Sequence, residues 1–187
     1  MISVITPTYR RPLELARAIR SVARQTTDDY EHLVISDGED IGTIEGCRTF
    51  ALGRNTADWG ATPRLVGTYF ARGDVIAYLD DDNEWEPHHL DALYHKLENS
   101  GADFAYSRAR YVSRTDSEKT TLKYIGAWPP QHGEIDTSLI MHRATLLNLS
   151  NWQNAGYASD WSLVHRWLSC GATAAFLDEV TVTYFGP

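Results

Sequence analysis

The sequence predicts an α/β fold in which a mostly parallel central sheet is covered by helices on both faces. Short apolar strands alternate with helical patterns over residues 1–100, and this order is typical of a parallel sheet. A polar cluster follows each strand, in "TPTYRR", "SDGED" and "DDDNEW". Because ligands of such sheets bind at the carboxyl ends of the strands, we expect the three clusters to meet along one rim.

The first two strands and the first helix follow from local patterns. Residues 2–6, "ISVIT", and residues 32–38, "HLVISDG", are short runs rich in β-branched residues that end in turn-forming ones. Between them, Pro12 opens a helix, because proline suits the first helical turn. Apolar residues recur along one face of that helix.

Cap signals bound the second helix. Thr62 is expected as its N-cap and Pro63 as its first residue, and Gly73 is expected to end it. Its inner face is expected to comprise Val66, Tyr69 and Phe70. A third strand follows at residues 75–79.

The second half of the chain reads as a more mixed pattern. A helix is expected from Pro87 to Gly101, and residues 103–113 and 120–128 read as strands of a hairpin. A further helix is expected at about Asp160–Cys170, before one or two final strands within residues 172–185. The strict strand–helix alternation therefore applies to the first half only.

Composition and charge narrow the class of protein. The chain has 187 residues, 43% of them hydrophobic, and a formal net charge of −8. This charge argues against nucleic acid as a partner, because phosphate backbones are bound by clustered Lys and Arg. No apolar run approaches the roughly 20 residues that cross a bilayer, and Cys47 and Cys170 show no metal-binding or disulfide spacing. We therefore expect a cytoplasmic protein with no transmembrane segment; a homodimer stays open.

The stretch "VIAYLDDDNEWEP" runs from an apolar strand into like charges at Asp80, Asp81 and Asp82. Crowded carboxylates raise the free energy of their ionised state, so a positive group is expected beside them. Alternate residues of a strand face the same way, so Asp80 and Asp82 are expected to converge. Two convergent carboxylates suit Mn²⁺ or Mg²⁺, which prefer oxygen ligands. A solvated acidic turn that caps the next helix is the structural alternative.

Four blocks carry a family resemblance over nearly the whole chain. They are "ISVITPTYRRPLELARAIRSVARQT", "HLVISDG", "ARGDVIAYLDDDNEWEPHHL" and "SDWSLVHRW". In this order and spacing they resemble the family-two inverting glycosyltransferases, with Asn83 where the third block commonly has Asp. The resemblance implies the GT-A fold in a single domain over residues 1–187. It also implies a metal-dependent transferase that moves a sugar from a UDP-sugar donor to a carbohydrate or other hydroxyl acceptor.

The resemblance assigns the nucleotide to residues 1–100, and the acceptor and catalysis to residues 101–187. Asp37 resembles the family's uracil-reading carboxylate, although an Asp-Gly turn is the structural alternative. Arg64 resembles the arginine near the diphosphate, at a helix start that also favours anions. The donor-binding residues expected by resemblance are Thr6, Pro7, Thr8, Tyr9, Asp37, Arg64, Asp80 and Asp81. The expected metal ligands are Asp82 and Asp80.

Asp160 is the general base that the resemblance implies, taking the proton of the acceptor hydroxyl. A helix-capping role is the alternative for this residue. Ser159 stands where the family often has Glu, so the second carboxylate is missing from this block. Many relatives also carry a metal-binding His near the end of the domain, and no His follows Asp178. His132 is a candidate for donor or metal contact.

Two questions stay open at the level of sequence. Trp128 and Trp152 are candidates for an acceptor platform, with core or edge packing as the alternative. The alternative function is a noncatalytic or hydrolysis-only domain that binds a nucleotide-sugar, suggested by the short end of the chain. A nucleotidyltransferase is disfavoured, because no Gly- and Lys-rich triphosphate loop is found near the start of the sequence.

Overall fold

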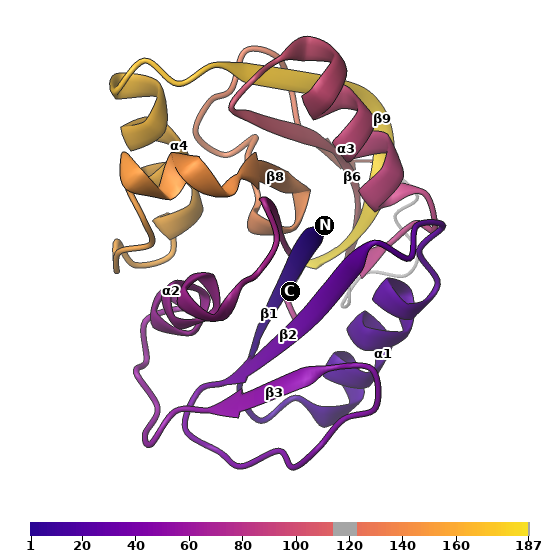
Figure 1. Ribbon diagram of the computed structural model, residues 1–187, viewed down its shortest axis with the longest axis vertical. Helices are drawn as coiled ribbons and strands as arrows, with labels where there is room; N and C mark the ends of the chain where they lie inside the picture. Colours follow the sequence, from indigo (N-terminus) through magenta and orange to yellow (C-terminus); the bar gives the residue numbers. More distant parts are fainter. Residues whose placement is uncertain (114–122, 187) are drawn as a thin grey trace.

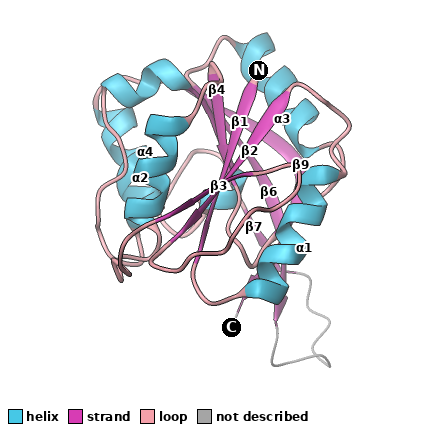
Figure 2. Cartoon of the chain, turned by 60° about the horizontal axis from the view of Figure 1, so that its bottom comes forward, coloured by secondary structure: helices cyan, strands magenta, loops and turns pink. Residues whose placement is uncertain are grey.

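The computed structural model describes residues 1–113 and 123–186. One sheet runs through this part of the chain, with α1 and α3 on one face and α2 and α4 on the other (Figures 1 and 2). Its strands are β1 (Ile2–Thr8), β2 (Tyr30–Ser36), β3 (Arg48–Ala51), β4 (Val75–Tyr78), β5 (Glu84–Trp85), β6 (Phe104–Ser113), β7 (Lys123–Ile125), β8 (Ile140–Arg143) and β9 (Ala174–Gly186). The helices are α1 (Pro12–Ala23), α2 (Ala61–Phe70), α3 (His89–Ser100) and α4 (Ser159–Ser169), with 3-10 turns η1 (Thr137–Leu139) and η2 (Ala144–Asn148). The α/β class with helices on both faces is confirmed.

The first half of the sheet is parallel and sets up the expected rim. The order is β3-β2-β1-β4, and every pairing among these strands is parallel. Backbone hydrogen bonds join the ends of these strands: Asp37 N donates to Thr8 O at 2.8 Å, and Leu79 N donates to Ile5 O at 3.1 Å. The carboxyl ends of β1, β2 and β4 therefore lie side by side, as the sequence predicts.

The second half of the sheet is mixed. β8 lies between β4 and β6 and is antiparallel to both, while β9 is parallel to β6. Among the described strands, parallel and antiparallel pairings are equal in number, so the sheet is less parallel than the alternating pattern suggests. The reason is that β8 is reached through a loop and the η1 turn, whereas a parallel neighbour requires a crossover connection, usually a helix.

The start of α2 differs from the expectation. Gly60 is the N-cap residue, with a left-handed φ of 81°, and Thr62 already lies in the first helical turn. The backbone N of Thr62 donates to Asp58 Oδ2 at 2.9 Å. The prediction of Thr62 as N-cap is therefore wrong, because Asp58 supplies the acceptor that the helix start requires.

The inner face and the end of α2 also differ. Tyr69 and Phe70 are 75% and 43% exposed, and the buried residues of this helix are Ala61, Pro63, Arg64, Gly67 and Thr68. The helix stops at Phe70, before Gly73, because Ala71 is extended. At Gly67 an added Cβ would lie 2.5 Å from Ile5 Cγ2. The helix therefore packs its glycine against β1, which leaves Tyr69 outward and Phe70 half-exposed against the ring of Phe50, while Val66 packs against the core as predicted.

The remaining elements agree more closely with the sequence. α1 begins at Pro12 as expected, and α3 begins at His89 and ends before Gly101, which has a left-handed φ of 64°. The hairpin is confirmed by the antiparallel pairing of β6 with β7; the first residues of its expected second strand, 120–122, lie outside the described residues. The last segment forms one strand, β9, and the short strands β3, β5 and β8 were missed.

Candidate active site

A cavity of about 550 Å³ opens at the carboxyl ends of β1, β2 and β4. It collects almost all of the residues that the sequence assigns to the donor and the metal. Those that line it are Pro7, Thr8, Tyr9, Asp37, Arg64, Asp80, Asp81 and Asp82. Thr6 is the exception: it is fully buried and its hydroxyl lies 2.9 Å from His32 Nε2. The Thr6 side chain is therefore part of the packing below the cavity.

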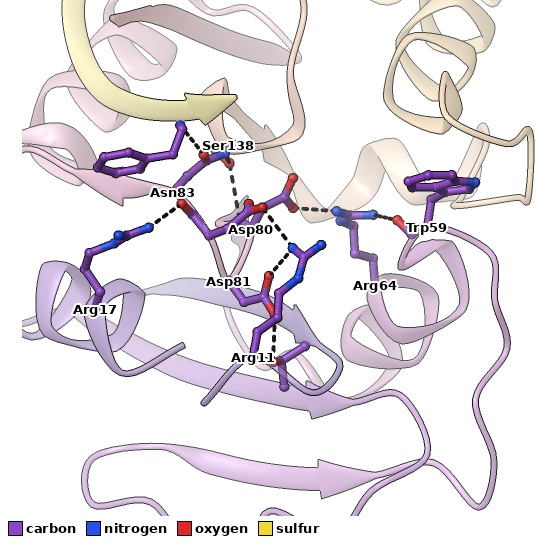
Figure 3. Close-up of polar contacts among 11 residues, drawn as sticks. Arg11, Arg17, Trp59, Arg64, Asp80, Asp81, Asn83 and Ser138 are labelled. Atoms are coloured by element: carbon purple, nitrogen blue, oxygen red, sulfur yellow. Dashed lines mark hydrogen bonds and ion pairs between the residues drawn. The ribbon is translucent and has the colours of Figure 1, made fainter. Parts of the chain in front are cut away.

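Arg64 is the positive partner of Asp80. This arginine is only 5% exposed, and its Nη2 forms an ion pair with Asp80 Oδ1, while its Nη1 donates to the Trp59 carbonyl at 2.9 Å (Figure 3). The guanidinium also lies over the ring of Trp152, 4.9 Å from its centroid. Trp152 is 2% exposed, so it is a core residue beneath Arg64 and its candidacy as an acceptor platform is wrong.

A second arginine bridges the other two carboxylates of the triplet. Arg11 Nη1 donates to Asp81 Oδ1 at 3.1 Å and to Asp82 Oδ2 at 2.8 Å (Figure 3). Thr8 Oγ1 also donates to Asp81 Oδ2 at 2.8 Å. Burial raises the pKa of Asp81 to about 6, against the opposing effects of the Thr8 hydroxyl and Arg11. The positive group that the crowded carboxylates require is therefore supplied by arginine side chains.

The side chains of the triplet do not alternate as they would in a strand. β4 ends at Tyr78, and Asn83 N donates to Asp80 O at 3.1 Å, which closes a turn. Asp81 and Asp82 consequently share one arginine, while Asp80 pairs with another. Asp81 is 5% exposed and lines the first cavity.

Asp37 is fixed by the segment that follows β3. Its carboxylate accepts from Asn55 Nδ2 and Thr56 N, both at 2.9 Å, and from the Thr56 hydroxyl at 3.0 Å. Tyr9, 37% exposed, stands on the same wall. Asn55 and Thr56 were missed, because nothing in their spacing distinguishes them from an ordinary loop.

A second cavity, of about 270 Å³, adjoins the first. The two share part of their lining, namely Trp59, Arg64, Asp80, Tyr157 and Tyr184. Asp160 and His132 line the second cavity only, so the structure separates them from the nucleotide-side residues. The exposed His132 lies near the ring of Trp161, with 6.3 Å between the ring centroids, and its contact with donor or metal stays a prediction.

Asp160 lies in the first turn of α4. Ala158 is the N-cap of that helix, so Asp160 is not its cap, and Asp160 Oδ1 accepts from Trp161 N at 2.6 Å. Burial raises its pKa to about 6, although the Trp161 N–H and Arg64 favour the ionised form. A carboxylate with such a pKa is ionised at neutral pH and is still a useful proton acceptor.

Asp136 is a further carboxylate in the second cavity that the sequence did not reveal. It precedes η1, and its Oδ1 accepts from Ser138 N at 2.9 Å. Burial, together with the charges of Asp80 and Asp160, raises the pKa of Asp136 well above its usual range. No periodic pattern or strand end marks this position in the loop, which explains why it was missed.

The residues at the rim supply only some of the ligands that a divalent cation requires. Within residues 1–113 and 123–186, no group of three or more His, Cys, Asp or Glu side chains is arranged to hold a metal ion. Mg²⁺, however, usually takes one or two carboxylates and completes its shell with water and substrate phosphates. Asp80, which lines both cavities, and Asp82, which lines the first, supply such carboxylates.

Comparison with known proteins places the chain in a family. The model of glycosyl transferase family 2 matches residues 3–166. The chain belongs to this family. Protein CgeD of Bacillus subtilis is 28% identical over 178 residues, covering 85% of this chain and 42% of that protein. The uncharacterized glycosyltransferase YwdF of the same organism is 30% identical, covering 64% and 46%. The chain thus spans less than half the length of these relatives.

Solved structures share the fold. TarS 1-349 of S. aureus in complex with UDP superposes with a TM-score of 0.79 at 16% identity, covering 99% of this chain and 60% of that one. The complex of TarS 1-349 with UDP-GlcNAc gives a TM-score of 0.77. The GT-A fold expected from the sequence is confirmed. None of the helices in the described part of this family 2 chain has the length and apolar character needed to cross a bilayer.

The raised pKa of Asp160 predicts how stability changes with pH. The pKa rises on folding from 3.8 to about 6, so between these values the folded state holds a proton that the unfolded state has released. Stability is therefore lost as the pH rises through this window. Asp160→Asn removes this loss and retains an acceptor for Trp161 N. We expect the variant to gain melting temperature relative to the parent between pH 4 and 6 and to keep the gain above pH 6. A melting-temperature difference that stays constant from pH 4 to 8 would contradict the burial of an ionised Asp160.

Proposed function

We propose that this family 2 domain transfers a sugar from a UDP-sugar donor to a hydroxyl acceptor, with inversion at the anomeric carbon and with Mn²⁺ or Mg²⁺. One observation carries the proposal: two adjoining cavities share Arg64 and Asp80 at their common wall. One cavity holds the residues suited to a nucleotide and the other holds Asp160. A nucleotide-sugar has the same order of parts, with the diphosphate between the base and the reacting carbon.

The first cavity offers a partner for each part of UDP. Asp37 is an anionic acceptor for the uracil N3–H, already oriented by Asn55 and Thr56. Tyr9, half-exposed on the same wall, presents a ring on which the base can stack. Arg64 lies in the first turns of α2, and its guanidinium favours the negative diphosphate. TarS 1-349 structures in complex with UDP and UDP-GlcNAc have this fold, which supports the choice of donor class.

Asp82, with Asp80, is the pair that would hold the divalent cation. When bound, such an ion stabilises the charge of the departing diphosphate. Arg11 already contacts Asp82, so it lies close enough to share the neutralisation of the phosphates. Without cations, two phosphate charges beside the acidic triplet would be repelled.

Asp160 performs the proton transfer in this scheme. The acceptor oxygen forms a bond to the anomeric carbon, and its proton passes to the Asp160 carboxylate. The bond from that carbon to the diphosphate oxygen breaks, and the electron pair leaves with UDP. Because this is one displacement, the product has the opposite anomeric configuration to the donor. Burial keeps the pKa of Asp160 at about 6, which suits a base working near neutral pH.

Asp160→Asn should nearly abolish transfer and leave the binding of UDP close to unchanged. The base acts in the transition state, so its loss appears in kcat, and base catalysis contributes ~10²–10⁴-fold. The measurement is product formation with Mn²⁺ and a panel of UDP-sugars and acceptors, beside calorimetry with UDP. Full transfer by the variant would remove Asp160 from this role. Release of UDP by the parent without transfer to any acceptor would favour the alternative of a domain limited to donor binding or hydrolysis.

Asp82→Asn tests the metal. We expect UDP to bind the parent at least tenfold more tightly with Mn²⁺ than with chelator, since about 1.4 kcal/mol of offset repulsion gives that factor. The variant should lose most of this difference. Glu84→Gln is the matched control, because Glu84 pairs with Arg17 and does not line the cavity. Equal affinity for UDP with and without Mn²⁺, measured by calorimetry on the parent, would contradict metal dependence.

A further inference from the structure

The chemistry of the second cavity is that of a carbohydrate-binding site. Asp136 and Asp160 present carboxylate oxygens, which accept hydrogen bonds from hydroxyl groups. The rings of Trp59, Tyr157 and Trp161 supply apolar faces in the same lining. Carboxylate oxygens that accept hydrogen bonds, next to aromatic faces, match a sugar ring, because such a ring has hydroxyl groups at its edges and an apolar C–H face. The cavity of about 270 Å³ is large enough for one such ring.

Trp59, one of the aromatic residues that line the second cavity, has an unusual backbone conformation. Trp59 has a φ of 58°, rare for a bulky residue, and its carbonyl is tied to Arg64 Nη1 at 2.9 Å. Its ring meets that of Tyr157 edge-on at 5.6 Å, and the two residues are 67% and 76% exposed. Strained residues of this kind concentrate at functional sites, where the surroundings over-determine them. Here the strain places an exposed aromatic pair over the junction of the two cavities.

Asp136 is firmly placed at this site. Its Oδ1 is fixed by Ser138 N at 2.9 Å. Ser138 is fully buried, and its hydroxyl accepts from Asp80 N at 3.2 Å and from Asn83 Nδ2 at 2.9 Å (Figure 3). The turn that carries Asp136 is therefore tied to the acidic turn after β4. A side chain on so rigid a support is suited to specific recognition.

The α4 block contributes one carboxylate, that of Asp160, to the second cavity. The neighbouring Ser159 also lines the cavity, but it is 3% exposed and its hydroxyl donates to Gly156 O at 2.7 Å. Ser159 is thus used within its own loop and offers the cavity no carboxylate. Asp136 lines the same cavity from the start of the η1 turn, so Asp80, Asp136 and Asp160 all line it, although the α4 block contributes only one of them.

We propose that the second cavity holds the sugar ring of the donor and that Asp136 accepts hydrogen bonds from its hydroxyl groups. The inference rests on the proposed function, because the sugar enters this cavity only when its diphosphate lies at Arg64 and Asp80. Asp136 is then a specificity-determining residue that acts on the sugar and not on the nucleotide. The proton acceptor of the reaction remains Asp160.

The difference between the binding free energies of a UDP-sugar and of UDP isolates the contribution of the sugar ring. Calorimetry with Mn²⁺ gives dissociation constants for UDP, UDP-glucose, UDP-galactose and UDP-GlcNAc on the parent and on Asp136→Asn. The amide retains an oxygen for Ser138 N but replaces the other carboxylate oxygen with an NH₂ group, which cannot accept a hydrogen bond. We expect UDP affinity to change less than twofold, and the best-bound UDP-sugar to weaken by about tenfold, as for loss of a hydrogen bond.

Asp40→Asn is the matched control. Asp40 is exposed, lies outside both cavities, and accepts from Gly42 N at 2.9 Å, in the same i to i+2 arrangement as Asp136 with Ser138. Neither UDP nor UDP-sugar binding should change in this variant. Equal weakening of UDP and UDP-sugar in Asp136→Asn, or no weakening of either, overturns the inference while leaving the UDP-sugar class intact. Failure of the parent to bind UDP overturns the proposed function, and this inference with it.

A second measurement changes the ligand instead of the protein and then combines the two changes. Analogues of the best-bound donor, each lacking one hydroxyl, are titrated into the parent protein. We expect at least one analogue to bind about tenfold more weakly than the complete donor, and Asp136→Asn to add no further loss for that analogue. If every analogue binds the parent as tightly as the complete donor, Asp136 does not read a sugar hydroxyl.

Discussion

The pairing of acidic side chains with buried or half-buried arginines is the constraint on which the site depends. The turn after β4 presents Asp80, Asp81 and Asp82 in succession, beside a further carboxylate at Asp136. Their mutual repulsion is offset by Arg64, which holds Asp80, and by Arg11, which holds the other two members of the triplet. Because the arginines come from α2 and from the segment after β1, this pairing also joins those two segments to the turn after β4.

The same pairing links the two halves of the domain. The parallel half of the sheet carries the first cavity, which contains Asp37. The mixed half carries the second cavity, which contains Asp160. Arg64 and Asp80 line both cavities, and the Ser138 hydroxyl ties the β4 turn to η1. The two cavities are therefore joined at the Arg64–Asp80 ion pair and at the Ser138 hydroxyl. A ligand that places a diphosphate there has its two ends directed into the two cavities.

The parts of this arrangement that the sequence predicted are those with a regular pattern. The strands β1, β2 and β4, their polar ends, and the helix that carries Asp160 all show clear periodicity or turn residues, and the structure gathers them as expected. The sequence predicted that a positive group lies beside the triplet, but it did not predict which residue supplies it. Arg11, for example, is separated from Asp81 by 70 positions in the sequence. Side-chain pairing over such a separation depends on tertiary structure.

The errors have a similar origin. The inner face of α2 was misassigned because helical periodicity takes no account of Gly67, whose close contact with Ile5 decides which side of the helix is buried. Asp136 was missed because no regular pattern marks its loop, and its raised pKa arises from burial and from the charges of Asp80 and Asp160, which are distant in sequence. Trp152, a plausible ligand platform from its type alone, proved to be the base on which Arg64 lies. Each of these residues acquires its role only when non-adjacent segments pack together.

A double-mutant cycle between Arg64 and Asp80 tests the central claim most directly. The free energy of unfolding is measured in urea for the parent, Arg64→Met, Asp80→Asn and the double variant. Contacts of Arg64 with Trp59 and Trp152 are lost in both backgrounds, so they cancel. The account predicts that Arg64→Met destabilises the parent by at least about 1 kcal/mol more than it destabilises Asp80→Asn, because it leaves a charge without its partner. Additive free energies would show that the acidic turn is stable without its arginine and would contradict the account.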